Sequence, residues 1–533
     1  MIVDAREMEQ DAEIHGAIAI IGGGAAGITL AIELAQQFKD VLLLESGGVE
    51  FEPDTQSLYD GPLLGHDSTV LDMSRLRFLG GTTNHWAGQC APFDAVDFER
   101  TADRPYSGWP FGLDALTPFY ERAYRYCELG VYRSASGIPR QAESAARQMV
   151  ESPELELTEF RYSPPTRFGS RYRSELRSSD KIKLYLHANV TDISVTDGGS
   201  SIPFIQAQTL TGKKFKVTAA AFILCCGGIE NPRILLNCTG YFPNGIGNES
   251  DLVGRFFMDH LQAKAGTIVP QNDSTEFGPF AYRHDAATSV RMALKNSAET
   301  VRRHGRRACS VILDPEFDWS ETALKARATP ASRAFRELVR DAKLGQLPLS
   351  LGQKECAALD DMGAIAADVY FRMNEYFGNK PVLKAIAARL EGEQSPNPDS
   401  RVVLVDGVDA LGMRKAGLDW RISAQDRDNL FQTAVALARG VGAAAFGRMV
   451  TFIEANDDQA FIQSTWHHMG TTRMHDDRRQ GVVDRDCKVH GLANIFIAGS
   501  SVFPAGSRVN PTLTIVALAI RLADHLKLKV KNP

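Results

Sequence analysis

Three glycines near the start of the chain, Gly22, Gly24 and Gly27, have the spacing GxGxxG and directly follow an apolar stretch at residues 17–21. Gly22 permits a tight turn, Gly24 lets backbone approach a pyrophosphate, and Gly27 lets the next helix pack close to the strand. The N-terminus of that helix would offer unpaired N–H groups to the phosphates. Glu45 follows eighteen positions after Gly27, where a carboxylate accepts hydrogen bonds from a ribose diol.

This context predicts one bound dinucleotide. FAD and NAD share the pattern, whereas an acidic Glu45 disfavours the 2′-phosphate of NADP. No second GxGxxG follows a convincing strand. The glycine turn by itself therefore leaves FAD and NAD open.

The elements around the turn read as strand, helix and second strand, which is a βαβ unit. Further β-rich segments lie at 181–195 and 215–224, and a glycine pair precedes a helical segment after the second of them. A last strand and helix occupy 493–503 and 510–526. The nucleotide-binding domain is therefore expected to be assembled from segments far apart in the sequence.

The rest of the chain lacks a dinucleotide signature but contains strand-like and helical segments. We expect an α/β chain (α+β overall), in which a discontinuous Rossmann-like domain is joined to a substrate-binding domain with an antiparallel sheet and helices. The predicted boundaries are 1–110, 166–258 and 459–533 for the nucleotide domain. The substrate-binding domain takes 111–165 and 259–458.

Several motifs then identify a family resemblance. They are FLGGTTNHWAGQ from Phe78, VGRFFMDH ending at His260, and a C-terminal block of WHHMGTTRM, GVVDRDCKVHG, NIFIAGSSVFP and NPTLT. In order and spacing they resemble the glucose-methanol-choline (GMC) oxidoreductases, and the C-terminal block is the most specific part. The resemblance implies FAD in the N-terminal site, so the Rossmann-like domain is predicted to be an FAD-binding domain.

The same resemblance implies the reacting residues. The family's H-x-x-G-T motif falls on His467, and the paired His or Asn position falls on Asn510. His468 is one residue out of register and is the main competitor for the role of base.

Oxidising an alcohol removes a proton from oxygen and a hydride from carbon, and flavin N5 takes only the hydride. Imidazole suits the proton because its pKa lies near working pH. Asn510 could hold the alcohol oxygen without titrating, and Asn510 and Pro511 predict an N-cap and first position of a helix starting at the site.

The segment around His85 resembles that of the pyranose-oxidising branch of the family, in which some members attach FAD covalently through a histidine. His85 is therefore a candidate for a covalent bond, with simple packing against FAD as the alternative. The full set of expected FAD contacts comprises glycines, hydroxyl residues and a few others: Gly22, Gly24, Gly27, Glu45, Gly80, Gly81, Thr82, Thr83, His85, Val190, Gly499, Ser500, Pro511 and Thr512.

Composition excludes several classes of protein. A net charge of −6 over 533 residues offers no basic field for nucleic acid. The N-terminus has no signal-peptide core, and no apolar run approaches the ~20 residues of a membrane span, so we expect a cytoplasmic protein without a membrane anchor. The eight cysteines lack paired CxxC spacing, which favours free thiols and no metal site. A run of basic residues at 302–307 is expected to be a solvated face, and is a weak candidate for contacting an electron-transfer partner.

The predicted function is FAD-dependent oxidation of an alcohol, with a sugar or glycoside as the favoured substrate. The electron acceptor stays open between oxygen, which would make an oxidase, and a quinone or partner subunit, which would make a dehydrogenase. Two alternatives remain: an aryl or aliphatic alcohol oxidase, and a hydroxynitrile lyase in which FAD is structural and the histidine does acid–base chemistry only.

Overall fold

The computed structural model describes residues 1–67, 70–132, 138, 140–164, 166–272, 277–284, 288–317, 329, 369, 383–454 and 461–530. Seven of the cysteines lie in these ranges and are free, while Cys356 lies outside the described residues. Among the described residues, no helix combines the length and the apolar character needed to cross a membrane.

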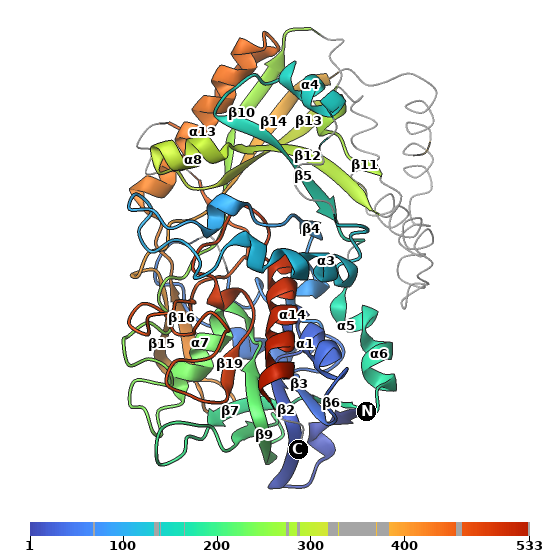
Figure 1. The fold of residues 1–533 in the computed structure, drawn as a ribbon, viewed down its shortest axis with the longest axis vertical. Coiled ribbons are helices and arrows are strands. Elements are labelled where there is room, and N and C mark those ends of the chain that lie inside the picture. Colours follow the sequence, from blue (N-terminus) through green and yellow to red (C-terminus); the bar gives the residue numbers. More distant parts are fainter. Residues whose placement is uncertain are drawn as a thin grey trace.

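An eight-stranded sheet within the described ranges forms the lower half of the molecule in Figure 1. Its order is β1-β6-β3-β2-β9-β8-β7, with β19 beside β9. The strands are β1 (Ile2–Asp4), β2 (Ala12–Ile21), β3 (Val41–Leu44), β6 (Ile182–Leu186), β7 (Asn189–Ile193), β8 (Ile205–Gln208), β9 (Lys214–Leu224) and β19 (Ile495–Ile497). The centre of the sheet is parallel, and β7 and β8 are antiparallel additions at one edge.

Helices cover this sheet in the manner of a Rossmann fold. The chain passes from β2 through α1 (Ala25–Leu34) to the parallel strand β3, which is the predicted βαβ unit. The C-terminal helix α14 (Thr512–Lys529) packs on α1 and on α3 (Thr117–Tyr126). Because helices lie over the sheet, β3 is apolar and buried at all of its positions.

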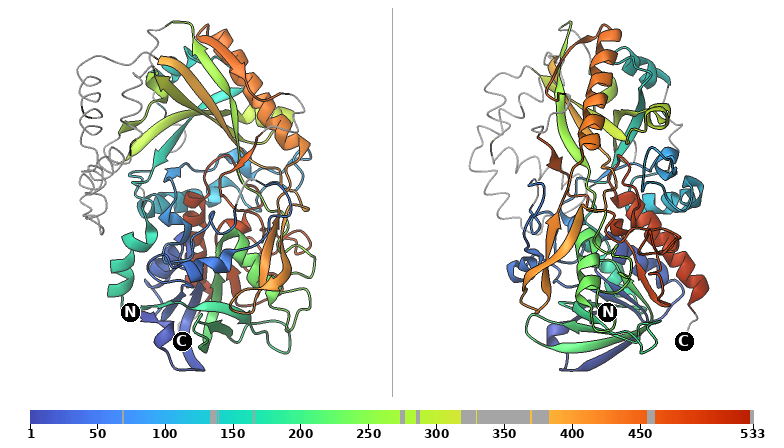
Figure 2. Two further views of the ribbon diagram at one scale, coloured as in Figure 1. Left: turned by 180° about the vertical axis from the view of Figure 1, so that it is seen from behind. Right: turned by 90° about the vertical axis from the view of Figure 1, so that its left-hand side faces the viewer.

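A second, antiparallel sheet forms the upper half of Figure 1, in the order β17-β10-β14-β13-β12-β5-β4 with β11 beside β12 and β18 beside β10. Its strands are β4 (Gln89–Cys90), β5 (Leu155–Tyr162), β10 (Leu261–Pro270), β11 (Arg283–His284), β12 (Ser289–Asn296), β13 (Cys309–Phe317), β14 (Leu383–Gly392), β17 (Gly447–Thr451) and β18 (Gln463–Ser464). The long helix α13 (Ala424–Ala443) packs across β10, β14 and β17. Figure 2 shows the two sheets stacked along the long axis in both further views.

The remaining described helices are short: α2 (Pro53–Gln56), α4 (Arg140–Arg147), α5 (Phe168–Arg171), α6 (Arg173–Ser178), α7 (Gly227–Asn237) and α8 (Ala298–His304). Helix α7 follows β9 and packs against a hairpin of β15 (Arg401–Val408) and β16 (Arg414–Asp419). Cys225 and Cys226 lie between β9 and α7.

The α/β fold with a discontinuous nucleotide domain is confirmed, since β2, β9 and β19 lie side by side. The domain boundaries stay a prediction, and three elements cross them. Strand β4 from 1–110 pairs in the second sheet, while α3 from 111–165 packs on α14. The hairpin β15–β16 from 259–458 packs on α7.

The basic run at 302–307 is not a free cationic surface. Arg302 pairs with Glu99, Arg303 with Glu299 and Arg306 with Glu154. Arg307 is buried and donates to the hydroxyls of Ser107 and Ser395. These ion pairs and hydrogen bonds favour a structural role for the basic run over a role as a docking site for an electron-transfer partner.

Candidate active site

A cavity of about 620 Å³ lies between the two sheets and contains most of the predicted site. Its walls include the glycine turn, Glu45, His467 and Asn510. The predicted FAD contacts that line it are Gly22, Gly24, Glu45, Gly81, Thr82, Thr83, His85, Val190, Gly499, Ser500, Pro511 and Thr512. Gly27 and Gly80 do not line it.

The three fingerprint glycines do different things. Gly22 has a φ of +108°, a conformation that favours glycine. A Cβ on Gly27 would lie 1.8 Å from the carbonyl oxygen of Gly22, so α1 packs against the turn only because this side chain is absent. A Cβ on Gly24 would meet nothing within 4 Å, and its backbone is open to the cavity.

The loop at Gly80 is held against the same turn. The N–H of Gly80 donates to Gly23 O at 2.8 Å, so this glycine positions the loop from behind the cavity wall. The hydroxyl of Thr83 donates to Gly80 O and accepts from the N–H of Phe168. Because this hydroxyl already has two partners, only the other atoms of Thr83 are left for the predicted cofactor contact. Thr82, in contrast, is exposed.

The donors and acceptors around the cavity fit FAD. Five of the lining residues have a buried side-chain nitrogen or oxygen without a partner in the described structure: Arg77 Nε, His85 Nε2, Gln89 Nε2, His468 Nε2 and Asn510 Oδ1. Buried polar atoms are normally hydrogen-bonded, so these atoms indicate a polar ligand. Glu45 accepts from the N–H groups of Gly23 and Gly47, and its carboxylate has capacity for further donors.

His467 is surrounded by polar groups on both sides of its ring. Its Nδ1 lies 2.8 Å from Nδ1 of His260 and 2.8 Å from Oγ1 of Thr465. Its Nε2 lies 3.2 Å from Nδ2 of Asn510. Burial lowers the pKa of His467 well below the usual imidazole value, and nearby His260 adds to this effect. The ring is therefore neutral at neutral pH and able to accept a proton.

The predicted N-cap role of Asn510 was wrong. Helix α14 begins at Thr512, with Pro511 in the cap position and no side-chain cap. The amide of Asn510 contacts His467 instead of the helix N–H groups. Pro511 and Thr512 still line the cavity, so the start of α14 lies at the site as expected.

His468, the competing histidine one residue out of register, also lines the cavity. Its ring lies 5.7 Å from that of Phe257, and burial lowers its pKa to about 4. Its backbone carbonyl accepts from the hydroxyl of Ser500. Unlike His467, it has no side-chain hydrogen-bond partner at Nε2 within the described residues.

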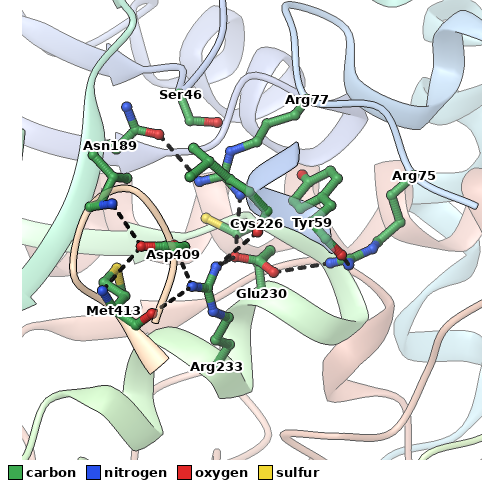
Figure 3. A network of polar contacts seen from close by, with 12 residues as sticks. Ser46, Tyr59, Arg75, Arg77, Asn189, Cys226, Glu230, Arg233, Asp409 and Met413 are labelled. Atoms are coloured by element: carbon green, nitrogen blue, oxygen red, sulfur yellow. Dashed lines mark hydrogen bonds and ion pairs between the residues drawn. The ribbon is translucent and has the colours of Figure 1, made fainter. Parts of the chain in front are cut away.

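A cluster of buried charges, missed in the sequence, forms another part of the wall (Figure 3). Glu230 on α7 pairs with Arg75, Arg77 and Arg233 at 3.0, 3.3 and 3.1 Å. Arg233 also pairs with Asp409. Three arginines against two carboxylates leave one net positive charge, and Arg75, Arg77 and Glu230 line the cavity.

The arginines control the ionisation of this cluster. Burial alone would raise the pKa of Glu230, but the three guanidinium groups outweigh it and lower the pKa to about 2. Arg75 and Arg77 also lie over the ring of Tyr59, at 4.0 and 4.8 Å from its centroid. Arg77 immediately precedes the FLGGTT motif, and that position is the one sequence signal that could have pointed to it.

The second sheet contributes a polar wall that the sequence did not predict. Its side chains come from β4, β5, β10 and β14 and from the segment before His467: Gln89, Tyr162, Gln262, Arg389, Glu391, Thr465 and Trp466. Tyr162 donates to Gln89 Oε1, and Arg389 and Gln262 donate to Glu391. Within the described residues, no three His, Cys, Asp or Glu side chains are grouped as metal ligands.

A dinucleotide-binding sheet, a second sheet and a His–Asn pair in one cavity define a two-domain oxidoreductase. Residues 396–519 match the family model for GMC oxidoreductases. The fructose dehydrogenase large subunit of Gluconobacter japonicus is 23% identical, over 96% of this chain and 97% of its own length. Paromamine 6′-oxidase of Streptomyces fradiae is 24% identical, over 95% and 90%. The solved structure of a pyridoxine 4-oxidase from Mesorbium loti has a TM-score of 0.57 at 16% identity, over 96% and 99%.

Residues 396–519 thus form a GMC oxidoreductase C-terminal domain, and the predicted resemblance to this family is confirmed. The predicted class of enzyme, an FAD-dependent oxidoreductase acting on an alcohol, is thereby confirmed. The assignment of individual site residues and the substrate stay predictions.

Proposed function

We propose that this protein oxidises a hydroxyl group of a sugar or glycoside to the carbonyl, with His467 as the base. The observation that carries the proposal is the pairing of His467 Nε2 with the Asn510 amide at 3.2 Å, in a cavity that also contains the dinucleotide fingerprint. A neutral imidazole at this point can take the proton of an alcohol. When bound, FAD supplies the hydride acceptor, its N5 atom.

Asn510 and His467 have different roles at the alcohol oxygen. His467 accepts the hydroxyl proton at Nε2, which becomes an N–H as the carbonyl forms. Asn510 orients the oxygen by a hydrogen bond and keeps the same charge throughout, because an amide does not titrate. Both residues are half-buried and line the cavity, so a bound substrate that fills the cavity would exclude water from the proton transfer.

The cofactor contacts follow from the cavity wall. Gly22, Gly24 and the N-terminus of α1 would hold the pyrophosphate, with Glu45 at the ribose. The excess positive charge of the cluster around Glu230 favours the same diphosphate, because Arg77 has a buried Nε without a partner in the described structure. His85 has a buried, unpartnered Nε2, which supports a covalent bond to FAD at this residue.

A sugar suits the polar wall of the second sheet. Gln89, Gln262 and the Arg389–Glu391 pair present planar donors and acceptors, which match vicinal hydroxyl groups. Trp466 is 42% exposed and lines the same cavity, so its ring can cover the apolar face of a pyranose. Two of the matched relatives are named for the oxidation of fructose and of paromamine, which supports a sugar or glycoside as the substrate.

The electron acceptor is oxygen in an oxidase, and a quinone or partner subunit in a dehydrogenase. The cytoplasmic location also stays a prediction. One of the matched relatives is named as a large subunit, which supports testing a partner as well as small acceptors.

One experiment addresses both substrate and acceptor. The purified flavoprotein is mixed anaerobically with sugars, glycosides, benzyl alcohol and aliphatic alcohols, and flavin absorbance is followed. We expect sugars or glycosides to bleach the flavin, and air or a quinone then to restore it. Bleaching by benzyl alcohol or an aliphatic alcohol alone would overturn the substrate class. An unchanged oxidised spectrum, together with cyanide release from a cyanohydrin, would identify a hydroxynitrile lyase.

A further inference from the structure

We propose that His260 is a positioning residue that keeps the proton of neutral His467 on Nδ1, so that Nε2 presents a lone pair to the cavity. The inference rests on the proposed role of His467 as base. It follows from the hydrogen-bond partners of four ring nitrogens, which leave one arrangement of protons.

The first step concerns Nε2 of His260. This atom lies 2.9 Å from Ser507 O and 3.2 Å from Gly506 O. A backbone carbonyl can only accept, so Nε2 of His260 must bear hydrogen. The ring is 2% exposed, and a second proton would place a charge there without a carboxylate partner among the described side chains. A neutral His260 therefore has a lone pair on Nδ1.

The two carbonyls that fix His260 are themselves fixed. The N–H groups of Gly506 and Ser507 both donate to one carboxylate oxygen of Glu393, at 3.1 and 3.2 Å. The Ser507 hydroxyl donates to Asp97 at 2.6 Å. Ser507 has a φ of +58°, a conformation that a residue with a side chain adopts only when its surroundings impose it. The loop is thus pinned from two sides.

The second step concerns Nδ1 of His467. Its neighbour at 2.8 Å is the lone pair on His260 Nδ1. Its other neighbour, Thr465 Oγ1, has two acceptors for its own hydrogen, Asp259 Oδ1 at 3.0 Å and His260 O at 3.4 Å, and can therefore also present a lone pair. Two acceptors face the same ring nitrogen, so His467 Nδ1 must carry the proton. Nε2 then carries the lone pair, in agreement with the amide N–H of Asn510 that lies 3.2 Å from it.

The arrangement supports the ring without relaying the proton any further. When His467 gains a proton on Nε2, its Nδ1–H bond to His260 strengthens, because a charged donor makes the stronger hydrogen bond. His260 Nε2–H ends on carbonyl oxygens, which do not take up a proton. The role of His260 is therefore to set the tautomer and orientation of the base.

Two substitutions separate this role from packing. His260→Asn retains an acceptor oxygen near the Nδ1 position but loses ring volume, whereas His260→Phe retains the volume but loses the acceptor. If His260 sets the tautomer, His260→Phe slows anaerobic flavin reduction by about 10²-fold or more and His260→Asn by much less, with FAD content and substrate affinity largely kept. If His260 only packs, the order of the two variants reverses and the inference is wrong.

A second readout does not depend on turnover. In protein labelled with ¹⁵N-histidine, the ring nitrogens of His467, assigned by comparison with His467→Asn, distinguish the two neutral tautomers. We expect hydrogen on Nδ1 in the wild type and a shift toward Nε2 in His260→Phe. Hydrogen on Nε2 in the wild type overturns the inference, even if no alcohol reduces the flavin. Failure of the wild type to be reduced, with the expected tautomer present, counts against the proposed function alone.

Discussion

Nδ2 of Asn510 lies 3.2 Å from Nε2 of His467, while Oδ1 of the same amide is buried without a partner among the described residues. The amide thus offers one atom to the base and keeps the other for a ligand. A hydroxyl that gives its proton to His467 can accept from the second N–H of the Asn510 amide, while Oδ1 can accept only from another donor of the ligand. The contact also explains why Asn510 does not cap α14.

Removing the base should slow the chemistry and leave the cofactor bound. His467→Ala is expected to lower the anaerobic rate of flavin reduction by at least ~10²-fold, as is typical of a lost general base. FAD content should be unchanged, because the cavity is lined by many other residues. Stopped-flow absorbance measures the rate.

The matched control is His468→Ala, which removes the neighbouring imidazole from the same cavity wall. We expect a much smaller loss, since Asn510 pairs with His467. An equal or larger loss in His468→Ala would transfer the base role to that residue.

The pH dependence of the rate should reflect the buried imidazole. Because burial holds the pKa of His467 well below the ordinary value of about 6.5, the ring is neutral from mildly acidic pH upward. The rate of flavin reduction should therefore be level through neutral pH and fall only on the acid side of 6.5. A midpoint at or above 6.5 would contradict a buried neutral base.

Glu391 should matter for sugars and not for simple alcohols. In Glu391→Gln, one buried acceptor of the polar wall becomes a neutral amide that no longer pairs ionically with Arg389. Loss of a hydrogen bond to a charged group costs about 1.5–3 kcal/mol, so KM for a sugar should rise by roughly tenfold or more. Reduction by benzyl alcohol should change little.

Asp314→Asn is the control for this variant. Asp314 pairs with the same Arg389 at 3.6 Å but does not line the cavity. Sugar kinetics close to those of the wild type are expected. If both variants raise KM equally, the effect belongs to Arg389 or to the sheet and not to Glu391.

The cluster around Glu230 should control stability as well as cofactor binding. Glu230→Leu leaves Arg75, Arg77 and Arg233 without their shared carboxylate, and breaking a buried pair typically costs about 3–5 kcal/mol. Denaturant unfolding of the flavin-free protein measures the loss. Glu230→Gln also removes the charge but keeps the size and one acceptor, so its loss should be somewhat smaller. Equal losses would assign the whole effect to the charge, and no loss in Glu230→Gln would show that the charge is not the cause.

Local patterns predicted the parts of this site that depend on neighbours in sequence. The strand, glycine turn and helix around Gly24 follow from periodicity and glycine spacing over some thirty residues. His467 and Asn510 were reached through the family register, since an isolated histidine or Asn-Pro pair indicates only packing or a cap. The N-cap prediction failed because the Asn510 amide found a tertiary partner in His467, which no local rule includes.

Contacts between segments that are far apart along the chain could not be predicted from the sequence. His260 and His467 are separated by 207 positions, and Arg233 and Asp409 by 176. The polar wall depends on the register of β10 with β14, where Gln262 faces Glu391. A shift of one residue would turn these side chains to the other face of the sheet, and the sequence of either strand does not fix that choice.

The predicted covalent bond between His85 and FAD can be tested by the colour of the precipitated protein. Its Nε2 is buried and unpartnered within the described structure, and its ring lies 5.6 Å from that of Trp466. Burial, with a contribution from Arg167, lowers the pKa of His85, so the ring keeps the lone pair that a covalent bond to FAD requires. After acid precipitation, yellow colour should stay with the wild-type protein and move to the supernatant in His85→Ala, while His468→Ala behaves as the wild type. Yellow supernatant from the wild type would mean that His85 only packs against the cofactor.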